Sequence, residues 1–466
     1  MRKFFGIAVL MFALLAMALV ACDDGDDDEA PPAATPTAAA TPAATATPEA
    51  TQAATPTATA AATAAATATP AATATPTAAA TEAPAALDED NPFRVAVIKN
   101  LTGIFGTFAH SNLVGFEAAV DLINESGGIL GRKLEYEVFD AQSDIPKGVE
   151  IINEVLLGDT QFHAVYPQSI GMQAVAPFIN DAGIISFSNS GDAALTDPSV
   201  SPWTFELPAL AYVQGESIAC LLPQLGHTKY AVLTGPGPYW DDNRAAWEDA
   251  FPQLGLEITA VEIVPFGTPD MTAQMQKLQA SGPDALLFDL FGPDILFAFQ
   301  AMENIGFDVP VVGGNSASTT DWSFIFTNIE EETPPGTILT AWNINIRRPD
   351  GLTPDQQRLL DAVSAKTDQI NGVLYQYAFG FDAAMLIRYA AETAGSDDQA
   401  AMLAALEGLG AVEDQSAFGF TLAPRYDFSP TFHGLASVPL STVVPGVAVE
   451  GFLDWGGIDW EAPCTN

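Results

Sequence analysis

Residues 123–134 have the sequence INESGGILGRKL, which predicts a helix that ends in a tight turn and is followed by a strand. The paired glycines Gly127 and Gly128 can take the left-handed backbone conformation that ends a helix. A second turn then reverses the chain into a strand that reaches Phe139 and Asp140. The stretch therefore favours a fold in which helices and strands alternate.

Short apolar runs rich in β-forming residues alternate with helical patterns along the chain around this stretch. The candidate strands are residues 93–98, 134–139, 163–166, 184–187, 230–233, 258–264, 285–288 and 309–312. Apolar residues recur at helical spacing in 114–124, 148–157, 243–251, 271–280 and 295–305. We therefore expect an α/β fold with mainly parallel sheets, which bind ligands beyond the carboxyl ends of their strands.

The N-terminal residues predict a lipoprotein signal peptide over 1–21. Arg2 and Lys3 precede an apolar run over 4–21 that ends at Cys22. Charge, apolar stretch and small residues before a cleavage point are typical of a secretory signal, and LVAC at 19–22 resembles the lipobox of bacterial lipoproteins. The resemblance implies cleavage before Cys22 and lipidation of Cys22. The alternative is a transmembrane helix, for which this run is at the lower limit of length.

Residues 22–90 predict a disordered tether. An acidic run over 23–29 is followed by a segment over 30–86 made almost wholly of Ala, Thr and Pro. Ordering such a segment would cost entropy without burial in return, because it lacks large apolar side chains. The acidic run also lacks the terminal bidentate Glu and the flanking helices of a calcium loop, so we expect no metal there.

From about residue 91 the composition is that of a globular protein, and this length predicts two domains. The formal net charge of −42 argues against nucleic acid or an anionic membrane surface as a partner, since both need a basic face. Two interpretations stay open for Cys220 and Cys464. They form one disulfide, as exported proteins allow, or Cys220 is a buried thiol and Cys464 is unpaired.

Several motifs, in their order and spacing, resemble the leucine/isoleucine/valine-binding type of periplasmic binding protein, the type I substrate-binding proteins of ABC transporters. The stretch 123–134 resembles the family's helix-to-strand turn, and YAFGFDA at 377–383 resembles its helix leading back into the first lobe. Residues 101–103, 182–186 and 193–197 are similar as well. The resemblance runs from Arg94 to about Asp427 and implies two α/β lobes, joined by crossovers, that close on a ligand. By position, lobe 1 is 92–208 plus 341–433, and lobe 2 is 209–340 plus 434–466.

The resemblance also implies polar ligand contacts in lobe 1. Ser169 matches a serine whose hydroxyl holds the ligand carboxylate in amino-acid binders. Ser188, Asn189 and Ser190 match the next loop, where backbone N–H groups and a hydroxyl complete that site. Hydrogen bonds to an ionised acceptor are strong, which suits this chemistry. The alternative is that these residues only cap helices and form turns.

Aromatic side chains at Phe108, Tyr239 and Phe291 match positions that wall the ligand in relatives, and the alternative for each is ordinary core. Asn315 stands where the amino-acid binders have an acidic residue that pairs with the ligand ammonium. Burying a cation without a counter-charge is costly. Either Asp289 or Asp241 supplies the charge, or the ligand lacks an ammonium.

No motif in the sequence supports catalysis. It contains no G-x-S-x-G, H-E-x-x-H or P-loop pattern, and its four histidines are scattered. We therefore expect no enzyme and no cofactor. The resemblance implies a lipoprotein on the outer face of the cytoplasmic membrane that delivers an amino acid, or a related small polar or carboxylate solute, to an ABC-transporter permease. The alternative is a receptor-type sensor of amides, urea-like compounds, or aromatic or short-chain acids.

Overall fold

The computed structural model describes residues 87–103, 106–167, 171–320, 322–329, 333–422, 425–436 and 438–459. The predicted signal peptide, the lipidation site Cys22 and most of the tether lie outside these residues, as do Ser169 and Cys464. Among the described helices, none combines the length and apolarity needed to cross a membrane.

The first sheet is wholly parallel, with strand order β2-β1-β3-β4-β5. Its strands are β1 (Asp88–Lys99), β2 (Arg132–Asp140), β3 (Ala164–Tyr166), β4 (Ser186–Ser188) and β5 (Thr204–Glu206). The intervening helices are α1 (Gly106–Glu125), α2 (Ile145–Leu157), α3 (Met172–Ala182) and α4 (Ala193–Thr196). Alternate residues of β1 face opposite layers. Val95 and Val97 pack in one apolar cluster with α1, whereas Ala96 and Ile98 pack in another with α2 and α3.

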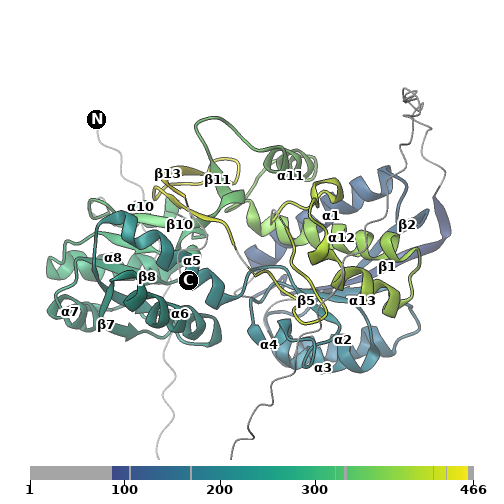
Figure 1. Ribbon diagram of the computed structural model, residues 1–466, viewed down its shortest axis with the longest axis horizontal. Helices are drawn as coiled ribbons and strands as arrows, with labels where there is room; N and C mark the ends of the chain where they lie inside the picture. The colour runs from purple at the N-terminus through teal and green to yellow at the C-terminus, as the bar shows by residue number, and fades with distance from the viewer. Residues whose placement is uncertain are drawn as a thin grey trace, which may run out of the picture. The chain divides into compact units, whose positions relative to one another are not determined.

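The second sheet has eight strands in the order β11-β13-β12-β10-β9-β8-β6-β7. They are β6 (Lys229–Thr234), β7 (Glu257–Ile263), β8 (Ala285–Asp289), β9 (Val311–Gly313), β10 (Ile338–Trp342), β11 (Ile346–Arg347), β12 (Leu440–Val443) and β13 (Leu453–Asp459). Strand β12 is antiparallel to both β10 and β13. Helix α5 (Ala211–Leu221) precedes β6, and the helices from β6 to β10 are α6 (Pro238–Leu254), α7 (Thr272–Ala280), α8 (Pro293–Ile305), α9 (Asn315–Ser318) and α10 (Trp322–Asn328). Figure 1 shows α6, α7 and α8 around β7 and β8.

Three later helices return to the first sheet, namely α11 (Pro354–Ser364), α12 (Tyr375–Ala394) and α13 (Gln399–Glu407). Short 3-10 helices cover Leu222–Leu225, Asn343–Asn345, Leu409–Ala411 and Ser416–Phe418. Helices α12 and α13 lie beside α1 and β1 in Figure 1. Helix α12 crosses α1 where Gly380 faces the Asn112 carbonyl and Gly115 faces the Tyr377 carbonyl, so closely that a Cβ on either glycine would clash. The motif at 377–383 thus contains the glycine that this crossing requires.

The structure confirms the predicted α/β fold and all eight predicted strands. The predicted turn is present too, because Gly127 and Gly128 both have positive φ and the chain enters β2 at Arg132. Two predicted boundaries differ. Residues 88–90, predicted as tether, begin β1, and β11 at 346–347, predicted within lobe 1, pairs with β13 in the second sheet. Cys220 in α5 is disulfide-bonded, which excludes the free-thiol interpretation, and its partner lies outside the described residues.

Candidate functional site

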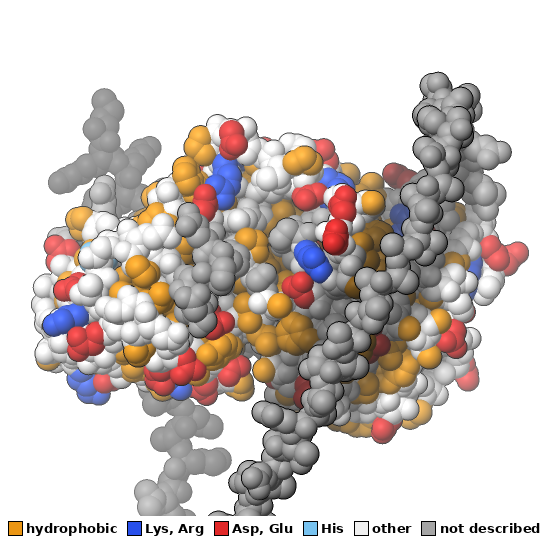
Figure 2. All heavy atoms as spheres, viewed as in Figure 1, with side chains coloured by type: hydrophobic (Ala, Val, Ile, Leu, Met, Phe, Trp, Pro, Cys, Tyr) orange, Lys and Arg blue, Asp and Glu red, His pale blue; other side chains and the backbone are white. Residues whose placement is uncertain are grey.

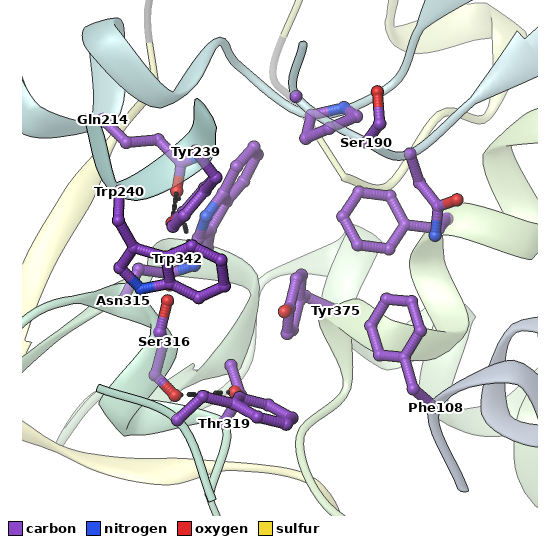
Figure 3. A pocket seen from close by; sticks show the side chains of 15 residues that line it. Phe108, Ser190, Gln214, Tyr239, Trp240, Asn315, Ser316, Thr319, Trp342 and Tyr375 are labelled. Atoms are coloured by element: carbon purple, nitrogen blue, oxygen red, sulfur yellow. Dashed lines mark hydrogen bonds between the residues drawn. The ribbon is translucent and has the colours of Figure 1, made fainter. Parts of the chain in front are cut away.

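A cavity of about 200 Å³ lies at the carboxyl ends of strands from both sheets. It is formed from the first turn of α1, the loop after β4, the starts of α5, α6 and α9, the loop after β8, the end of β10 and the first turns of α12 (Figure 3). The lining residues are Phe108, Asn189, Ser190, Gly191, Pro208, Gln214, Tyr239, Trp240, Phe291, Asn315, Ser316, Thr319, Trp342, Tyr375 and Phe379. This is the place where parallel α/β sheets bind ligands.

Seven of these fifteen side chains are aromatic, and none is charged. Tyr375 links two groups of them, because its ring lies 5.1 Å from that of Phe379 and 6.3 Å from that of Trp342, between ring centroids. On the opposite wall the rings of Tyr239 and Trp240 meet edge to face at 5.2 Å. A largely aromatic wall with a few polar groups suits a small organic molecule with an apolar body.

A hydrogen-bonded group of polar side chains lies on the second-sheet side of the cavity. The Tyr239 hydroxyl donates to Gln214 Oε1 at 3.3 Å, and Asn315 Nδ2 lies 3.5 Å from the same oxygen. Gln214 Nε2 in turn donates to the Ala209 carbonyl at 2.9 Å. These hydrogen bonds orient the Asn315 amide through its nitrogen. Asn315 Oδ1 has no hydrogen-bond partner among the described residues.

Behind this group, at the end of β8, lies the carboxyl of Asp289, which is 1% exposed. The carboxyl lies near the side chain of Ser316, which lines the cavity. Its Oδ2 has no partner among the described residues, and burial raises the pKa of Asp289 to about 7. Asp241, the other carboxylate considered for ligand charge, is exposed and pairs with Arg244 at 2.9 Å. Neither carboxylate lines the cavity, and of the two only Asp289 is buried.

On the first-sheet side, Glu206 at the end of β5 orders the loop after β4. It is fully buried, and it accepts hydrogen bonds from the Ser190 hydroxyl at 2.8 Å and the Gly191 N–H at 2.9 Å. Burial raises the pKa of Glu206 to about 7, although its hydrogen bonds oppose that rise. Ser190 and Gly191 reach the cavity through this arrangement.

The cavity brings together six of the eight predicted site residues: Phe108, Asn189, Ser190, Tyr239, Phe291 and Asn315. Ser188 does not line it, because it belongs to β4 and is completely buried, and its Oγ accepts a hydrogen bond from the Ser190 N–H at 3.3 Å. Ser169 lies outside the described residues. The ligand-binding role of all eight stays a prediction.

Sequence reasoning missed four aromatic residues of the cavity, namely Trp240, Trp342, Tyr375 and Phe379. Trp342 ends β10, a strand that was not predicted, although the rule that sites follow strands would have found it. Tyr375 and Phe379 are in the first turns of α12. Phe379 belongs to the motif that was assigned only to the return of the chain.

Comparison with known proteins agrees with this geometry. Residues 92–436 match the family model described as "Periplasmic binding protein". The chain belongs to this family. It is 21% identical over 306 residues to the leucine-, isoleucine-, valine-, threonine-, and alanine-binding protein of Pseudomonas aeruginosa, which covers 66% of this chain and 79% of that protein.

Two solved structures show the same fold at low identity. One is a branched-chain amino acid transporter substrate binding protein from Streptococcus pneumoniae in complex with isoleucine, with TM-score 0.63 and 18% identity, covering 78% of this chain and 98% of that one. The other is a solute binding protein from R. palustris in complex with 4-hydroxybenzoate, with TM-score 0.63 and 18% identity, covering 79% and 96%. These proteins are solute binders rather than enzymes.

Proposed function

We propose that this protein is the extracytoplasmic solute-binding component of an ABC importer, and that it holds one small organic solute in the aromatic cavity. The observation that carries the proposal is the cavity itself, which joins the carboxyl ends of strands from both sheets and is walled by seven aromatic rings. Membership of the periplasmic binding protein family supports it. The partner would be a membrane permease that recognises the loaded form, in which the two lobes have closed on the solute.

The proposed location is the outer face of the cytoplasmic membrane. The LVAC motif at 19–22 supports lipidation of Cys22, and the Ala/Thr/Pro-rich segment would then serve as a tether. In cells that process lipoproteins, the chain should incorporate a labelled fatty acid, and Cys22→Ser should abolish the incorporation. Equal labelling of both forms would rule out Cys22 as the anchor.

The relatives bind solutes of amino-acid size. They include branched-chain amino acids, and two structural relatives are complexes with 4-hydroxybenzoate and 3,4-dihydroxy benzoic acid. An amino acid, or a related small polar or carboxylate solute, is therefore the group to test first. A receptor-type sensor would use the same cavity, and only transport dependence distinguishes it from an importer component.

The test is a thermal-shift screen of the full chain against amino acids, amides, urea, amines and small carboxylic acids, followed by calorimetry on any compound that raises the melting temperature. Phe291→Ala should weaken binding of that compound about tenfold, because Phe291 lines the cavity. Phe324→Ala is the matched control, since these two rings are 43% and 44% exposed and Phe324 is outside the cavity. Equal affinities for the two variants would exclude this cavity as the binding site.

A further inference from the structure

Three side-chain acceptors around the cavity are left without hydrogen-bond partners in the described part of the chain. Asn189 Oδ1 and Asn315 Oδ1 belong to lining side chains that are 8% and 5% exposed, and neither oxygen has a hydrogen-bond partner among the described residues. Asp289 Oδ2, behind Ser316, is a third such acceptor. Buried polar groups in native proteins are nearly always paired, so these oxygens call for a ligand that brings donors.

In the loop after β4, the described donors expected to hold a ligand carboxylate are already used within the protein, and Ser169, the other expected donor, lies outside the described residues. In the loop after β4, the Ser190 hydroxyl and the Gly191 N–H both donate to Glu206, at 2.8 and 2.9 Å. The Ser190 N–H donates to Ser188 Oγ at 3.3 Å, and the Asp192 N–H donates to Ser190 Oγ at 3.2 Å. A carboxylate placed at this loop would find its donors taken and the Glu206 carboxyl next to it.

Basic side chains do not offset this excess of acceptors. No lysine or arginine is among the lining residues. The buried lysine of the first sheet, Lys99, has its Nζ 3.1 Å from the centre of the Tyr166 ring and 3.4 Å from the Pro167 carbonyl, and it is not among the residues that line the cavity. Burial also holds the pKa of Lys99 well below its usual range. The surroundings of the cavity thus favour positive charge and disfavour negative charge.

We propose, resting on the proposed function, that the solute is an organic amine: an ammonium group on an apolar or aromatic body, without a carboxylate at the loop after β4. The ammonium lies against Asn315 Oδ1, where it feels the charge of the Asp289 carboxylate, which lies beside Gly314. The faces of the surrounding rings stabilise the same charge, since cations are attracted to aromatic faces. Asn189 Oδ1 accepts a further N–H donor.

Two indole N–H groups complete the description of the solute. Trp240 Nε1 and Trp342 Nε1 are buried donors without partners among the described residues. As neutral donors they suit a neutral oxygen, such as a hydroxyl or a carbonyl, on the body of the amine. They carry no formal charge with which to hold a carboxylate.

The test compares compounds that share one body and differ in their charged groups. Full-length protein is titrated calorimetrically with 2-phenylethylamine, 3-phenylpropanamide, 3-phenylpropanoate and phenylalanine. It is then titrated with the four compounds in which an isobutyl group replaces the benzyl group. In at least one series the amine should bind at least tenfold more tightly than the acid and the amide. Tighter binding of the acid, the amide or the amino acid would overturn the inference and leave the proposed function standing. Binding of none of the eight would count against both.

Variants locate the charge that is responsible. Asp289→Asn should weaken binding of the amine about tenfold or more, because it removes the buried carboxylate while keeping its shape. Asp241→Asn is the matched control: it makes the same change of charge at an exposed residue in the helix that carries Tyr239, and it should leave the affinity unchanged. Glu206→Gln should raise the affinity for 3-phenylpropanoate. An equal loss of affinity in both Asp variants would show a general effect of net charge instead, and would overturn the assigned role of Asp289.

Discussion

Glu206 shows how one residue links the site to stability. Its pKa in the folded protein is about 7, above the ordinary value of 4.5, because burial disfavours the charged form. The contribution of Glu206 to the free energy of unfolding is therefore fully present below pH 4.5 and is lost as pH rises to 7. The loss amounts to about 3 kcal/mol. Glu206→Gln should flatten this part of the curve of unfolding free energy against pH, measured by urea denaturation. Glu248→Gln, at an exposed glutamate, is the control. If the curves of unfolding free energy against pH run parallel for Glu206→Gln and the parent, Glu206 does not cause the pH dependence of stability.

Asp289 makes a second prediction at the scale of single residues. Because burial raises the pKa of Asp289 to about 7, its carboxyl is largely neutral at pH 6 and largely ionised at pH 8. The affinity for an amine should therefore rise with pH by at most tenfold per unit below 7, and level off above it. Calorimetry at pH 5.5 to 8.5 checks the profile, and Asp289→Asn should flatten it. An affinity that falls as pH rises over this range would contradict the sign.

Among the elements, the crossing of α1 and α12 matters most for the site, because the two helices carry Phe108 and Phe379 into the cavity. Gly380→Ala would place a methyl group against the Asn112 carbonyl, so the helices must separate. We expect a loss of about 2 kcal/mol in unfolding free energy. Gly148→Ala is the control: this glycine is also helical, but its Cβ would meet only the Ala141 methyl at 3.9 Å, and alanine favours a helix. If both variants are equally stable, the crossing does not need its glycine.

Taken as a whole molecule, the fold could be predicted further than the site. Of the nine parallel strands that precede β10, eight, β1–β4 and β6–β9, have clear apolar runs, whereas the three-residue strand β5 was not predicted. The strands β10 to β13 do not alternate with helices in the same way, and β12 and β13 pair antiparallel. No alternating strand–helix pattern in the sequence therefore indicated them. The cavity depends on Trp342 and Tyr375, which lie far along the chain from Phe108. No local pattern indicates which distant elements will meet, and the internal use of the Ser190 and Gly191 donors by Glu206 becomes visible only in three dimensions.

The net charge of −42 leads to a prediction about the whole molecule. Acidic side chains outnumber basic ones 58 to 16, and Figure 2 shows Asp and Glu side chains spread over the visible face with fewer Lys and Arg among them. Mutual repulsion of like charges destabilises a compact state. Salt shortens the screening length from about 30 Å at 0.01 M to about 10 Å at 0.1 M. The melting temperature should therefore rise between 10 and 200 mM NaCl, and by the same amount in KCl, because the effect depends on ionic strength rather than on the cation. A melting temperature that falls over this range would mean that the described ion pairs, such as Arg132 with Asp397, outweigh the repulsion.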